Sequence, residues 1–102
     1  MSATVHVVQH YSTSTPMVMQ ACDHLMAELL RREAQNSSVR DAAVSADAAV
    51  GSVEVEVVAE GADEWDAQQA ALTRIRASVT AIAKVGLQLR ERDRTVELLP
   101  AG

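Results

Sequence analysis

Aromatic side chains are almost absent from this chain of 102 residues, which has one Trp, one Tyr and no Phe. Proteins that bind single-stranded nucleic acids without sequence preference stack the bases on aromatic rings. The formal net charge of −5 also differs from the basic surface that releases counterions from phosphates. We therefore expect no direct binding to nucleic acid.

Cysteine is equally scarce. Cys22 is the only one, so an intramolecular disulfide is excluded. The sequence shows no signal-peptide pattern and no apolar run long enough to span a bilayer. These absences favour a cytoplasmic protein that does not associate with membranes.

Several sequence motifs that mark catalytic or ligand-binding sites are also absent. We find no phosphate-binding loop, no glycine motif for dinucleotides, no Ser–His–Asp arrangement and no zinc-knuckle spacing. We therefore expect no cofactor, no metal site and no catalytic residue, although the sequence leaves open whether the protein is an enzyme. Cys22 lies on an apolar helix stripe and is best interpreted as a small core residue.

The length of 102 residues predicts one domain, residues 1–102, with one hydrophobic core. Hydrophobic residues make up 48% of the chain, but most of them are Ala and Val. A core of small side chains buries modest apolar area per residue. We therefore expect the protein to form a homo-oligomer, which buries more surface.

The clearest local pattern begins after Gly51, where Val53, Val55 and Val57 alternate with Glu54 and Glu56. In an extended chain, successive side chains point to opposite faces. The pattern predicts a half-buried strand with valines on one face and carboxylates on the other.

A helix is predicted directly after this strand. Asp63 is placed to cap its N-terminus, and Gly86 is placed to end it in the left-handed conformation. Arg74, Arg76 and Lys84 lie away from the apolar side. The predicted buried stripe consists of Trp65, Leu72, Ile75, Val79 and Ile82.

The N-terminal region predicts a first strand over residues 3–11, followed by a loop and a first helix. Thr15 is a suitable N-cap and Pro16 a suitable first helical residue, while Asn36 is expected to end the helix. One face of the strand carries Val5, Val7 and Tyr11, and the other carries His6, Val8 and His10. The expected apolar face of the helix comprises Val18, Cys22, Leu25 and Leu29, widened by Met19, Met26 and Leu30.

Residues 39–50 are ambiguous because their composition also suits a helix. We favour a strand, since Gly51 and Ser52 would then form a short hairpin into the valine-rich strand. The helix remains an alternative.

The end of the chain contains two apolar pairs in opposite alternation phases. Leu87 and Leu89 share one phase, and Val96 and Leu98 share the other. One regular strand cannot bury both pairs on the same face. The chain must bulge or turn near residues 91–94, giving either a hairpin or a helix-terminal extension before a last strand at residues 95–99.

The resulting order of elements is β-α-β-β-α-β, which predicts an α+β, ferredoxin-like two-layer sandwich. In this topology, both helices cover one face of a four-stranded antiparallel sheet, and the first and third strands are central. The other face of the sheet would be open to solvent or to a partner.

The first candidate site follows from this topology. His6 and His10 would project from the open face beside Glu54 and Glu56. Carboxylates next to imidazoles can form a metal site, a proton-transfer pair or a pH-sensitive interface. His6 and His10 lie about 13 Å apart along the strand, so they cannot share one ion within a subunit. Ordinary cross-strand pairing on a solvated face is the simpler interpretation.

Two further candidates are weaker. The hydroxyls of residues 12–15 could bind a phosphate at a helix N-terminus, although N-capping alone would explain them. Arg90, Arg92 and Arg94 would form a ridge on one side of an extended chain and could bind an anionic protein partner. All charged residues at positions 41–66 are acidic, and basic residues predominate among those at positions 74–94, a segregation that could orient subunits.

We therefore expect a small, non-enzymatic interaction or assembly module that binds a protein partner or further copies of itself. One version is an accessory or structural subunit of a phage or other mobile element. The alternatives are a small-molecule-binding or proton-transfer enzyme of the dimeric α+β type, and an acidic inhibitor of a nucleic-acid-binding partner.

Overall fold

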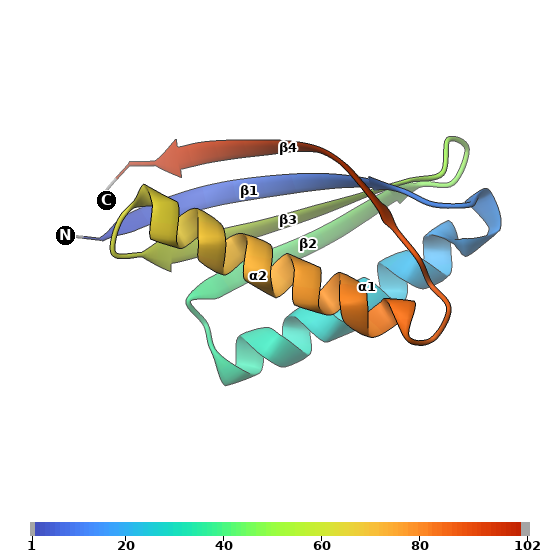
Figure 1. Cartoon of the computed structure of the whole chain (residues 1–102), viewed down its shortest axis with the longest axis horizontal. Coiled ribbons are helices and arrows are strands. Elements are labelled where there is room, and N and C mark those ends of the chain that lie inside the picture. Colours follow the sequence, from blue (N-terminus) through green and yellow to red (C-terminus); the bar gives the residue numbers. More distant parts are fainter. Residues whose placement is uncertain (1, 101–102) are drawn as a thin grey trace.

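The computed structural model describes residues 2–100 and has the predicted order of elements (Figure 1). The strands and helices are β1 (Ala3–Ser12), a 3₁₀ turn η1 (Thr15–Met17), α1 (Val18–Gln35), β2 (Val39–Asp47), β3 (Ser52–Gly61), α2 (Glu64–Ala83) and β4 (Arg90–Leu99).

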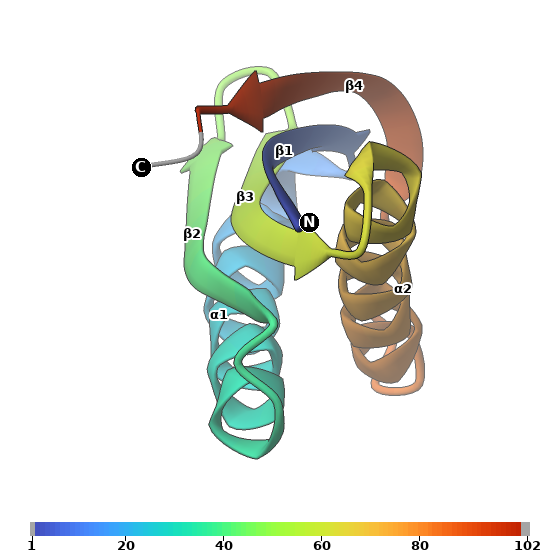
Figure 2. The same ribbon diagram turned by 90° about the vertical axis from the view of Figure 1, so that its left-hand side faces the viewer.

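The strands form one antiparallel sheet in the order β2-β3-β1-β4. Figure 2 shows α1 and α2 on the same side of this sheet. The ferredoxin-like sandwich is therefore confirmed, and so is the central position of the first and third strands. The face of the sheet that points away from the helices is called the open face below.

The core lies between the sheet and the helices. Val5, Val7 and Tyr11 of β1 are buried there, and Gln9 lies among them. Val53, Val55 and Val57 of β3 are buried on the same side, as their alternation predicts.

The ambiguous segment is a strand over residues 39–47, shorter than the predicted 39–50. The hairpin turn consists of residues 48–51 and not of Gly51 and Ser52, because Ser52 already belongs to β3. Gly51 adopts a φ of 68°, and a side chain there would lie 2.5 Å from the carbonyl oxygen of Thr13. Glycine therefore suits this turn, because it adopts a positive φ without strain and has no side chain to clash with Thr13.

The start of the first helix differs from the prediction. Thr15 is not the N-cap but the first residue of η1, and the N-cap position belongs to Ser14, whose side chain makes no capping hydrogen bond. Pro16 lies in the first turn as expected, and its missing N–H costs nothing there. Asn36 ends α1 as predicted.

The exposed side of α1 also differs. Met19 and Leu30 were expected to widen the apolar face, but they are 59% and 51% exposed. The buried residues are Val18, Ala21, Leu25 and Leu29, which form a narrower stripe than predicted.

The second helix begins as predicted, because the Asp63 carboxylate accepts a hydrogen bond of 2.8 Å from the backbone N–H of Asp66. Trp65, however, is 66% exposed, so its predicted place in the buried stripe is wrong. Ala67 faces the core instead, where a side chain at Gly61 would lie only 2.4 Å from its backbone nitrogen. Residues two apart on a helix point in nearly opposite directions, so this close contact turns Trp65 outward.

The last strand begins at Arg90, five residues earlier than expected, and no hairpin forms. The predicted irregularity is present as a shift in register between β1 and β4. Gln9 pairs with Arg94 and Tyr11 pairs with Glu91, so two residues of β4 bulge opposite His10. The bulge lets Leu87, before the strand, and Val96, within it, both pack on the core.

Candidate functional site

The central strands bring the four candidate residues of the open face together. His10 lies directly opposite Glu54 in the register of β1 and β3, and Val8 lies opposite Glu56. His6 is therefore diagonal to Glu56, within reach of a long side chain.

Each histidine contacts one glutamate. The Nε2 atom of His6 lies 3.3 Å from Oε1 of Glu56, and Nε2 of His10 lies 3.5 Å from Oε1 of Glu54. The four side chains are 31% to 42% exposed, so solvent or a partner can reach both pairs. The predicted juxtaposition is thus present, as two separate pairs. Such pairs can transfer protons, bind an ion or stabilise an interface.

Polar contacts continue on both sides of these pairs. Arg40 and Glu60 form an ion pair of 3.1 Å toward one end of the face. Near the other end, the Ser45 hydroxyl donates a hydrogen bond of 3.3 Å to Glu54. A shallow hollow of about 310 Å³ lies beside Glu54 and His10 there.

Within residues 2–100, no three His, Cys, Asp or Glu side chains come close enough together to hold a metal ion. Each His–Glu pair is therefore limited to two protein ligands from its own chain. Neither α1 nor α2, within the same residues, combines the length and apolar composition needed to cross a bilayer.

The three arginines of β4 do not form the predicted ridge. Arg90 pairs with Ser12 and Arg94 pairs with Gln9, two residues of β1 that face opposite sides of the sheet. The bulge between them changes the phase of the alternation, which a regular strand would have kept. Arg92 donates a hydrogen bond of 3.1 Å to the Ser12 hydroxyl. A role for these arginines in partner binding stays a prediction.

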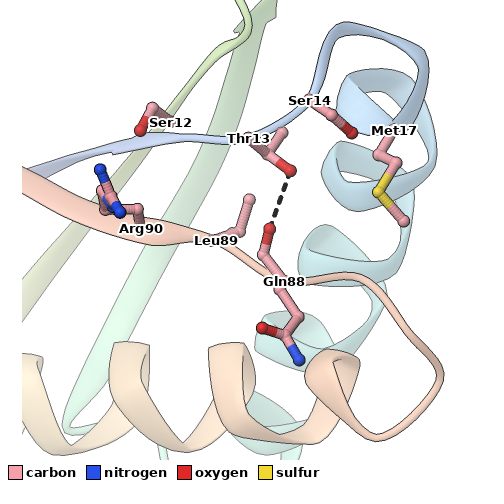
Figure 3. A pocket seen from close by; sticks show the side chains of 7 residues that line it. All are labelled: Ser12, Thr13, Ser14, Met17, Gln88, Leu89 and Arg90. Atoms are coloured by element: carbon pink, nitrogen blue, oxygen red, sulfur yellow. Dashed lines mark hydrogen bonds between the residues drawn. The ribbon is translucent and has the colours of Figure 1, made fainter.

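Hydrogen bonds connect the loop at residues 12–15 to neighbouring segments of the chain (Figure 3). The Thr13 hydroxyl donates a hydrogen bond of 2.8 Å to the carbonyl of Gln88, and the Thr13 backbone N–H donates one of 2.9 Å to the carbonyl of Gly51. An open hollow of about 600 Å³ lies against this loop. Because Thr13 uses both donors internally, it offers none to a phosphate.

Three side chains have roles that sequence reasoning missed. Gln9 is fully buried and makes hydrogen bonds to the bulge of β4. Its place in the alternation with Val7 and Tyr11 was the signal that could have found it. Arg74 of α2 donates hydrogen bonds of 2.7 Å to the carbonyl of Asn36 and 3.1 Å to that of Val39. No local pattern in the sequence marks that long-range contact.

Tyr11 is the third. It is 3% exposed, and its hydroxyl has no hydrogen-bond partner among the described residues. Burial, and secondly the negative charge of Glu91, raise the pKa of Tyr11 from 10.0 to about 12.

No family model matches the chain, and no curated protein matches it in sequence. Among solved structures it is similar to one described as "De novo designed protein Foldit4", with 16% identity, a TM-score of 0.41 and both chains covered completely. A TM-score of this size carries no argument about function. The candidate site therefore rests on its geometry.

Proposed function

We propose that this protein is a small, non-enzymatic interaction module that forms a homodimer through the open face of its sheet. The observation that carries this proposal is the contrast between the two edges of the sheet, which are irregular, and the open face, which is continuous and carries three glutamates in contact with His6, His10 and Arg40. The edges are β2 and β4, and the open face is the side of the sheet away from the helices in Figure 2.

The edges are poorly suited to pairing with another chain. In β2, the register shifts between Arg40 and Ala43, and Asp41 adopts a φ of 55°. In β4, the bulge is accompanied by a run of alternating charges at residues 90–94. Bulges and charges on edge strands are the devices by which proteins prevent edge-to-edge association.

The open face is better suited to contact with another copy of the chain. Val8 and Val58 are half-buried near its centre, and three glutamates around them contact His6, His10 and Arg40. A twofold dimer places the same surface of both copies in contact, so it requires a self-complementary surface. Paired charges meet this requirement because they avoid repulsion between like charges.

Light scattering coupled to size-exclusion chromatography tests the proposal. We expect a dimer at tens of micromolar protein, and a monomer for Val8→Arg, which places a charge at the centre of the open face. Thr73→Arg is the matched control, since Thr73 is exposed on α2 in the other layer. A monomeric wild type, or equal dimerisation of both variants, would contradict the proposal.

A second candidate function is favoured by the hollow beside His10 and Glu54, which could admit a small molecule. In this alternative, a dimeric α+β enzyme or sensor uses the imidazole for proton transfer. Comparing His6→Ala and His10→Ala with the wild type in a small-molecule binding screen tests it, and unchanged binding and turnover in both variants would end it.

A further inference from the structure

We propose that the two His–Glu pairs of the open face are half-sites for a divalent metal ion of the Zn²⁺ type, each completed by a pair from a second copy. This inference rests on the proposed dimer. The N···O separations of 3.3 Å and 3.5 Å are longer than those of strong charge-assisted hydrogen bonds, which measure about 2.7–2.9 Å. The atoms of each pair therefore remain available to an ion.

Two ligands of a tetrahedral zinc ion, at bond lengths of about 2.0–2.2 Å, lie about 3.4 Å from each other. The Nε2 and Oε1 atoms of each pair already have this separation. Imidazole nitrogen and carboxylate oxygen are both ordinary zinc ligands. An ion can therefore bind either pair without a change in backbone, because rigid central strands fix both members.

One chain cannot complete such a site. Zinc that holds structure together takes four ligands, and each pair supplies two. His6 and His10 lie about 13 Å apart along β1, so the two pairs cannot combine within one copy. Glu97 of β4 lies opposite His6 in the register, but among the described residues 2–100 no three His, Cys, Asp or Glu side chains come close enough together to hold an ion.

A second copy supplies the missing ligands. The pairs lie on either side of Val8. A twofold axis close to Val8 therefore places the two pairs of one copy opposite the two pairs of the other. Sheets that pack face to face lie about 10 Å apart, which leaves about 5 Å on each side for a ligand side chain and its bond to the ion. The dimer would then bind two ions, one for each chain.

Sedimentation velocity with ZnCl₂ as the only added ligand tests this inference. Protein stripped with a chelator is compared with the same protein at one molar equivalent of Zn²⁺ per chain. We expect zinc to lower the dimer dissociation constant about 100-fold, because it binds the four-ligand site of the dimer more tightly than a two-ligand pair of the monomer. Bound zinc, measured after desalting, should be one ion per chain.

Three variants refine the test. The double variant His6→Ala with His10→Ala should lose the effect of zinc, and His24→Ala, on the exposed side of α1, should keep it. Val8→Arg retains all four ligands, yet it should lose tight zinc binding because it prevents the faces from meeting. Zinc bound equally well by Val8→Arg monomers would overturn the shared site.

The outcomes also separate the two proposals. A wild-type dimer of equal strength with and without zinc would support the open-face dimer and overturn the metal site. A wild type that remains monomeric in both conditions would overturn both. Zinc-dependent dimerisation that survives loss of His6 and His10 would place the ion elsewhere and overturn this inference alone.

Discussion

The side-chain amide of Gln9 donates a hydrogen bond of 3.0 Å to the backbone carbonyl of Arg92, although 83 residues separate the two in sequence. The same nitrogen lies 3.2 Å from the carbonyl of Asp93. A bulge removes carbonyls from the regular ladder, and a buried carbonyl without a donor is costly. Gln9 thus satisfies the irregular part of β4 from inside the core.

Replacing Gln9 by leucine should therefore destabilise the protein by about 1–3 kcal/mol, because a residue of similar size leaves the bulge carbonyls without their donor. Urea denaturation measures the loss. Hydrogen exchange should show faster opening of residues 90–94 than of β1. Gln20→Leu, at an exposed position of α1, is the control and should change stability little. Equal effects of the two variants would refute the role of Gln9.

Tyr11 predicts a specific sensitivity to alkali. Its pKa is raised to about 12 in the folded state, so folding favours the protonated phenol. This contribution is complete below pH 10, where the phenol is protonated in both states, and it is lost as the pH rises from 10 to about 12. The full difference corresponds to about 2–3 kcal/mol.

We expect Tyr11→Phe to remove this part of the alkaline destabilisation. At pH 8 the variant should be as stable as the wild type or slightly more stable, because the buried hydroxyl lacks a partner. Urea titrations of both proteins between pH 8 and 12 should give curves that diverge above pH 10. Parallel curves would show that Tyr11 ionises as easily in the folded state as in the unfolded state.

Gly61 and Gly86 predict contrasting effects of the same substitution. Gly61→Ala would place a methyl group within 3 Å of three backbone atoms of α2, none of which can move alone. It should cost about 1–3 kcal/mol or more, like other overpacked sites. Gly86→Ala meets no atom within 4 Å and suffers only from its φ of 89°, a cost of about 1 kcal/mol. Thermal unfolding compares them, and the reverse order would contradict the tight contact.

Arg74 and Arg76 form a second matched pair. Arg74 is partly buried, which lowers the pKa of its guanidinium, and it holds two carbonyls at the turn between α1 and β2. Arg74→Met should cost about 1–3 kcal/mol, since a charged donor to two carbonyls, one of them in a partly buried hydrogen bond, is lost. Arg76 makes an exposed ion pair with Glu91, so Arg76→Met should cost less than about 1 kcal/mol. Similar losses of stability in both variants would show that the Arg74 hydrogen bonds stabilise the protein no more than the exposed ion pair of Arg76.

The strands and the layers were predictable because their signals are local. Alternation at Val53, Val55 and Val57 and the cap at Asp63 depend on neighbours in sequence, and the structure has them as expected. The opposite phases of the two C-terminal leucine and valine pairs were enough to predict a bulge. The placement of the His–Glu pairs followed from the topology.

What could not be predicted depends on contacts between distant segments. Trp65 fits a helical stripe, but the approach of Gly61 to Ala67 decides which side of α2 faces the sheet. The side chains of Gln9 and Arg74 donate hydrogen bonds to carbonyls that lie 83 and 38 positions away. The division of the β4 arginines between two faces likewise depends on where the bulge falls, which the sequence placed only within residues 91–94.

The central strand β1 lies between β3 and β4, so its partners are translated long after it. On the ribosome, residues 3–12 emerge before residues 90–99 and must wait for them before their second side is paired. Until then, a valine-rich strand presents free backbone groups to any other chain. Synthesis of this protein should therefore be most vulnerable to aggregation just before β4 leaves the exit tunnel.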